Sequence, residues 1–194
     1  MRLKFICAGL FLSAASCAVS QVSPSATQGG IPFKVGVAYS NYYTDWSGFE
    51  SGPTAWLDWT LSRGPAIVNG LGIEAEGRDL NYARTGSEPK LRQDTAEGGP
   101  VYHWAHFDRF EPYAKFLMGF GHIAFNDVTD PYYTHDSRTV LAPGGGAEYR
   151  ITRNIWLRGD YEYQFWLDFF RHHAMTPEGV TVGVSYDFSR MHSR

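Results

Sequence analysis

The chain has 194 residues, which is enough for one domain of ordinary size or for a closed barrel. Its formal charge of −3 argues against a nucleic-acid partner, and after the N-terminal segment no run of about 18 apolar residues marks a membrane helix. Two compositional facts favour a barrel instead: aromatic residues make up 16% of the sequence, and glycine occurs 21 times in mostly strand-like and turn-like contexts.

The first twenty residues predict an export signal. MRLK is a short basic segment, FICAGLFLSAA is apolar, and Ala18-Val19-Ser20 offers small residues for cleavage. The mature chain would then begin near Gln21, and Cys7 and Cys17 would leave with the signal, so that no disulfide could form. A lipoprotein signal is the alternative, with AAS before Cys17 as its modification box. Residues 21–31 are small and polar and predict a loose leader.

Eight later segments alternate between apolar and polar residues, the period of two that indicates a β-strand. The expected strands are residues 33–40, 54–61, 71–82, 101–109, 112–122, 139–151, 154–165 and 179–188. In 101–109 both parities carry aromatic residues and histidines, so the facing of that strand stays open. Connections after the second, fourth and sixth strands are short and the others longer, which is typical of a membrane barrel with tight periplasmic turns. The predicted barrel spans 32–188, followed by a short extension at 189–194.

The polar face of these strands carries charge. The stretch NIWLRGDYEYQF, residues 154–165, has apolar side chains at almost every second position. In a soluble protein these apolar side chains would face a core. In an outer-membrane barrel they would face lipid, and the charged side chains between them would point into the lumen. Six acids and four bases form the predicted interior network, a near balance that fits a plugged lumen because buried charges are tolerated only when paired. Its members are Asp58, Glu74, Glu76, Arg78, Lys115, Glu148, Arg150, Arg158, Asp160 and Glu162. With the export signal, this pattern predicts an all-β, eight-stranded antiparallel up-and-down transmembrane β-barrel in the bacterial outer membrane.

Three stretches, PYAKFLMGFG at 112–121, GGGAEYRITRNIWLR at 144–158 and GVTVGVSYDF at 179–188, resemble the eight-stranded outer-membrane barrel family that includes the OmpA transmembrane domain and the opacity-type surface proteins. The resemblance implies that Tyr186 and Phe188 form an assembly signal at the end of the last strand, although SRMHSR follows it here. It implies that Glu74, Glu76, Lys115, Arg158 and Glu162 hold the lumen shut or gate a small conductance. The implied partners are outer-membrane lipid and lipopolysaccharide, with the barrel-assembly machinery and periplasmic chaperones during biogenesis.

Candidate chemistry is sparse. His135-Asp136-Ser137 matches the HxS pattern of lipid A deacylase-type barrels, with Glu148 as the acid, but it falls in a predicted loop and Arg138 stands where that motif favours Asn. The histidines at 103, 106, 172 and 173 predict no metal site, and no cofactor is expected. Aromatic residues in YYTDW, DPYYTH and LDFF could form a surface for an unknown ligand.

The sequence therefore predicts an integral outer-membrane barrel with a side-chain-filled lumen, an envelope-structural or surface-interaction role, and no enzyme activity. Two alternatives remain open. One is a narrow, gated channel for small ions, and the other is a lipid A-modifying enzyme built on His135 and Ser137.

Overall fold

The computed structural model describes residues 33–44, 48–61, 70–82, 91–104, 109–125, 135–167 and 175–190. The predicted signal peptide and leader lie outside the described residues, as do His106, His172 and His173 and most of the connecting segments. Among the described residues, no helix is long and apolar enough to cross a membrane.

Nine strands and one short helix make up the described chain. They are β1 (Phe33–Thr44), β2 (Gly48–Thr60), β3 (Leu71–Tyr82), β4 (Leu91–His103), β5 (Phe110–Phe125), β6 (His135–Arg150), β7 (Ile155–Tyr163), β8 (Phe165–Trp166), β9 (Glu178–Asp187) and the 3₁₀ helix η3 (Phe188–Arg190).

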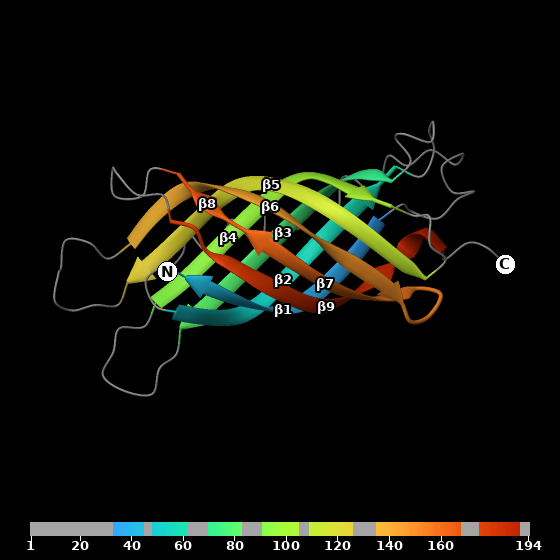
Figure 1. The fold of residues 1–194 in the computed structure, drawn as a ribbon, viewed down its shortest axis with the longest axis horizontal. Helices are drawn as coiled ribbons and strands as arrows, with labels where there is room; N and C mark the ends of the chain where they lie inside the picture. The colour runs from blue at the N-terminus through green and yellow to red at the C-terminus, as the bar shows by residue number, and fades with distance from the viewer. Residues whose placement is uncertain are drawn as a thin grey trace, which may run out of the picture.

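These strands form a closed antiparallel barrel. The order of neighbours is β5-β4-β3-β2-β1-β9-β7-β6, and pairing of β5 with β6 closes the ring. The two-residue β8 pairs with β6 and continues β7 beyond Gln164, so β7 and β8 act as one broken strand. The strands run obliquely around the long axis of the barrel (Figure 1). The predicted eight-stranded up-and-down barrel is confirmed.

The barrel has two distinct ends. The turn end is where β1, β3, β5 and β7 begin and where β2, β4, β6 and β9 end. The loop end is where β1, β3, β5 and β8 end and where β2, β4, β6 and β9 begin (Figure 1).

Side chains alternate between the lumen and the outside along every long strand. In β7 the alternation is nearly strict, with Trp156, Arg158 and Asp160 buried while Ile155 and Leu157 are exposed. The exposed parity of the other strands is apolar as well. It includes Val37, Leu57, Ile73, Phe116, Met118, Phe120, Val182 and Val184. A continuous apolar exterior around a polar interior is the division that a lipid-spanning barrel requires.

Several expected strand boundaries are wrong. The fourth strand is 91–103, not 101–109, and Val101 and His103 face the lumen. The sixth begins at His135 instead of near residue 139, and the last ends at Asp187 instead of Phe188. Because β1 and β2 extend toward each other, only residues 45–47 separate them. The expected alternation of short and long connections therefore fails at the first pair.

The fourth strand was misplaced because LRQDTAEGGP has the composition of a loop. Its residues nevertheless pair with β3 on one side and mostly with β5 on the other. Gln93, Thr95 and Glu97 point into a polar lumen, and Ala96 points outward. Strand preference depends on packing context more than on intrinsic residue type, so pairing on both sides outweighs the weak local propensity.

Glycines on the inner face make room for large aromatic side chains. A Cβ atom at Gly36 would overlap the ring of Trp56, and one at Gly121 would overlap the ring of Trp166. An eight-stranded barrel is only wide enough for side chains to fill it, so a bulky ring on one strand requires an absent side chain on another.

Candidate functional site

The centre of the lumen is organised around Arg158. Its Nη1 and Nη2 atoms donate to the two carboxylate oxygens of Glu74, each at 2.8 Å, and Nε donates to Asp160 Oδ2 at 2.9 Å. The guanidinium also lies 4.6 Å from the ring of Trp56 and 4.4 Å from the ring of Tyr113. A bidentate pair from strands β7 and β3 therefore spans the barrel and holds it in one geometry.

Lys115 and Arg78 continue this network toward the loop end. Lys115 Nζ lies 2.7 Å from Glu76 Oε2 and 2.8 Å from Glu162 Oε2, with Glu74 Oε1 at 3.5 Å. Arg78 Nη1 donates to Glu162 Oε1 at 2.9 Å, and Nη2 pairs with Glu76. Every one of these side chains is buried, so the three cations of the central network pair with its four carboxylates away from water.

A polar layer and then an apolar plug follow at the loop end. Gln164 Nε2 lies 3.0 Å from Glu162 Oε1 and 3.2 Å from Glu97 Oε1, while Trp166 Nε1 donates to Gln164 Oε1 at 3.0 Å. Above this layer the lumen is closed by a buried hydrophobic cluster made of Ile123, Val140, Trp166 and Met175. The lumen is therefore filled from the central charges to the loop end.

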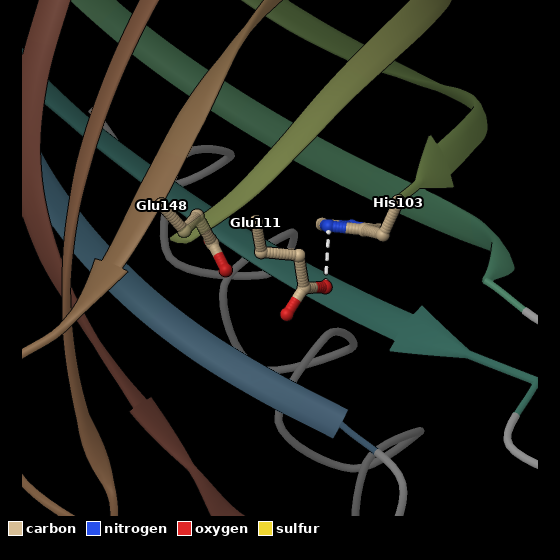
Figure 2. Close-up of side chains that lie close together, drawn as sticks. All are labelled: His103, Glu111 and Glu148. Atoms are coloured by element: carbon tan, nitrogen blue, oxygen red, sulfur yellow. Dashed lines mark ion pairs between the residues drawn. The ribbon is translucent and has the colours of Figure 1, made fainter. Parts of the chain in front are cut away.

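A second group of charged side chains lies at the turn end (Figure 2). His103, the last residue of β4, places Nε2 2.8 Å from Asp58 Oδ2 and Nδ1 3.0 Å from Glu111 Oε1. Lys34 Nζ, from β1, donates to Glu148 Oε2 at 2.5 Å and lies 3.6 Å from Glu111 Oε1. We call these five residues the turn-end cluster.

The structure places nine of the ten predicted network residues in the lumen, where all are buried. They are Asp58, Glu74, Glu76, Arg78, Lys115, Glu148, Arg158, Asp160 and Glu162. Asp58 and Glu148 belong to the turn-end cluster, and the other seven form the central network. Arg150 differs, because it is half-buried at the end of β6 with its guanidinium 5.7 Å from the ring of Trp156.

Sequence reasoning missed several members of the lumen. Lys34 lies on the inward-facing parity of the first predicted strand. This position was the signal by which it could have been included in the predicted interior network. Glu97 and Glu111 were overlooked because both fell in segments expected to be connections, although β4 and β5 include them. His103 was considered only together with His106, His172 and His173, all three of which lie outside the described residues.

The predicted assembly residues lie at the turn end. Tyr186 is exposed on the outer face of β9, and Phe188 begins η3, with its ring 5.0 Å from Phe33 and 4.8 Å from Tyr186. Their role in assembly stays a prediction.

Ser137 has a different histidine neighbour from the expected one. It lies within β6 on the outer face, and its Oγ is 2.8 Å from Nδ1 of His122 on β5. Glu148 lies in the lumen near the opposite end of β6, so the acid considered for a triad is not brought to Ser137. Within the described part of the chain, His122 contacts Ser137 and the ring of His135, and neither supplies a carboxylate.

The closed antiparallel barrel, its apolar outer face and its paired interior charges together define the class of the protein as a bacterial outer-membrane β-barrel. The chain belongs to the family of the outer membrane protein beta-barrel domain, which it matches over residues 7–188. Among the curated proteins, none matches the sequence significantly.

Solved structures of similar fold are outer-membrane barrels too. Ail, the attachment invasion locus protein of Yersinia pestis, is 18% identical, with a TM-score of 0.56 over 83% of this chain and 99% of that one. Neisserial surface protein A is 15% identical, with a TM-score of 0.59 over 82% and 99%. The N-terminal barrel domain of OprF from Pseudomonas aeruginosa is 14% identical, with a TM-score of 0.50 over 81% and 99%. At these identities the likeness concerns the fold.

Proposed function

We propose that this outer-membrane barrel is a sealed envelope protein that holds its loop-end connections at the cell surface for structural or interaction roles. The observation that carries the proposal is the filled lumen. Arg158, Tyr42, Leu117 and Trp166 are among the largest fully buried side chains, and they come from different strands. A barrel filled by side chains offers a rigid support, not a water-filled path.

The surface part of the proposal rests on the topology and on a named relative. Short turns face the periplasm in barrels of this kind, so we assign the turn end to the periplasm and the loop end to the outside. The similar barrel Ail is an attachment invasion protein by name, and it has been solved in complex with the heparin analogue sucrose octasulfate. Binding segments are commonly loops positioned by a rigid scaffold, which is what a sealed barrel provides.

Conductance in planar lipid bilayers tests whether the lumen is sealed. We expect no resolved current steps from the wild-type barrel, because paired charges and the apolar plug fill the interior. Lys115→Ala should produce steps, since it removes a central side chain and leaves Arg78 as the one remaining cation that Glu76 and Glu162 share among the described residues. Arg92→Ala, which changes an exposed ion pair with Asp79 and Asp94, should stay silent. Steps of defined size from the wild-type protein would instead support the gated channel.

The enzyme alternative has its own test. His122 gives Ser137 the neighbour that a nucleophile needs, but no hydrogen bond between His122 and a carboxylate is found among the described residues. We expect that Ser137→Ala leaves the acyl composition of lipid A unchanged, as measured by mass spectrometry of lipid A from cells expressing either protein. A deacylated species that is present with the wild-type barrel and lost with Ser137→Ala would contradict this expectation.

A further inference from the structure

The turn-end cluster contains three ligand atoms gathered around one point. Nδ1 of His103, a carboxylate oxygen of Glu111 and a carboxylate oxygen of Glu148 all lie within 4.8 Å of one another. They come from the neighbouring strands β4, β5 and β6, and in Figure 2 the two carboxylates and the imidazole edge lie close together. We propose that these three residues bind a divalent transition-metal ion of the zinc type at the turn end of the lumen.

Two of the three ligands carry a buried atom that no hydrogen bond satisfies. His103 is 1% exposed and Glu148 is 0% exposed, and neither His103 Nδ1 nor Glu148 Oε1 has a hydrogen-bond partner among the described residues. Nδ1 lies at ion-pair distance, 3.0 Å, from Glu111 Oε1, but the angle between the two groups is not that of a hydrogen bond. Buried polar atoms without a partner are rare in folded proteins, and coordination to an ion is one way in which such atoms are satisfied.

The hydrogen bond on the other side of His103 prepares it as a ligand. An ionised Asp58 can only accept, so the Nε2 atom 2.8 Å away carries the proton. In the metal-bound form the imidazole is neutral, with its second proton released, and it presents the lone pair of Nδ1 toward Glu111 and Glu148. A carboxylate that accepts from the far nitrogen of a metal-bound histidine is the common supporting arrangement, because it fixes both the tautomer and the ring orientation.

The charge of the cluster matches a divalent ion. Asp58, Glu111 and Glu148 contribute three carboxylates, and Lys34 contributes the single ammonium that contacts two of them. With a neutral His103, two negative charges remain uncompensated in a buried place. Uncompensated buried charge is costly, and a bound divalent cation would cancel it while Lys34 keeps its contact with the second oxygen of Glu148.

The ligand types and the access route select the kind of metal. Imidazole suits zinc and its neighbours in the transition series, while magnesium and calcium prefer oxygen ligands alone. Bonds of about 2.0–2.1 Å in a tetrahedral site require ligand atoms roughly 3.3 Å apart, so the widest separation among the three ligand atoms would have to close by up to about 1.5 Å. The Glu111 side chain is 14% exposed and the cluster is at the turn end, so an ion can reach it from that side, with water as the fourth ligand.

Zinc titration of the full chain tests this site. The protein, purified in detergent and stripped with a chelator, is titrated with ZnCl2 in a calorimeter, after a gel shift on boiling shows that each variant is folded. We expect Glu148→Gln to weaken zinc binding at least ~100-fold while it keeps the size of the side chain and a polar contact to Lys34. Asp58→Asn, which acts on the orientation of His103, should weaken it about 10–100-fold.

Matched controls separate this site from other histidines. The double change His172→Ala with His173→Ala and the single change His122→Ala should leave the zinc affinity within about twofold of the wild type. X-ray absorption at the zinc edge should show one imidazole among oxygen ligands. Three outcomes would overturn the proposal. In the titration these are the absence of saturable zinc binding, or a zinc affinity that neither Glu148→Gln nor Asp58→Asn changes. In the absorption spectrum it is a signal from two or more imidazoles. A fourth such outcome is an NMR spectrum in saturating zinc that shows protons on both nitrogens of His103.

Discussion

Replacing Arg158 with methionine is expected to lower the free energy of unfolding of the barrel by about 3–5 kcal/mol. Methionine keeps much of the volume of the side chain, but it leaves the carboxylates of Glu74 and Asp160 in the lumen without their main cation. Breaking a buried ion pair from one side is costly because the remaining charge has lost both its partner and its water. Equilibrium unfolding in urea, followed by tryptophan fluorescence in lipid vesicles, measures the change.

The chain offers a matched control for this substitution. Arg92 also pairs with two carboxylates, Asp79 at 2.8 Å and Asp94 at 3.0 Å, but its side chain is 53% exposed. Arg92→Met should therefore cost no more than about 1 kcal/mol, the range typical of exposed ion pairs. If Arg158→Met and Arg92→Met lower the free energy of unfolding equally, the central network is hydrated. That result would contradict the filled lumen on which the proposed function rests.

An arginine on the outer face at the middle of β5 should destabilise the barrel by about 2–4 kcal/mol. Met118 is 58% exposed and lies near the centre of Phe110–Phe125, where the hydrocarbon layer is expected. Met118→Arg places a charge in lipid, whereas Phe110→Arg at the turn end of the same strand should cost about 0–1 kcal/mol, because the interface is close. The same urea titration in vesicles compares the two.

The contrast between the two positions is the informative quantity. If Met118→Arg lowers the free energy of unfolding no more than Phe110→Arg does, the hydrophobic layer lies elsewhere along the barrel. In that case the outward face would need a different alignment with the membrane.

Much of the barrel follows from a local pattern in the sequence. The alternation in residues 154–165, with Arg158, Asp160 and Glu162 on one parity, sets which residues share a face, because successive side chains of a strand point to opposite sides. Once an outer-membrane barrel is inferred, the charged parity must point inward, since lipid excludes it. This reasoning reached the closed eight-stranded fold, and it identified residues that the structure places in the lumen, such as Glu74 and Lys115.

Local pattern was insufficient where a strand carries small and polar residues. Residues 91–100 look like a loop, and they become part of β4 because β3 and β5 supply hydrogen bonds on both sides. Glu97 was overlooked for this reason. Glu111 was overlooked because the fifth strand was predicted from its apolar stretch, and β5 begins before that stretch. Arg150 keeps the inward parity, yet it lies at the rim because parity gives the face of a side chain and not its depth along the barrel.

The sequence by itself determined the class of fold and the inward face of most strands, because both depend on a period of two within single segments. Only the tertiary structure decided which charges meet across the lumen. Strand tilt and register bring Glu74 of β3 to Arg158 of β7, and Lys34 of β1 to Glu148 of β6, over 84 and 114 residues of sequence. Such pairs depend on closure of the whole ring, which no local segment specifies. The turn-end cluster exists for the same reason, because β4, β5 and β6 place His103, Glu111 and Glu148 together only once they are paired.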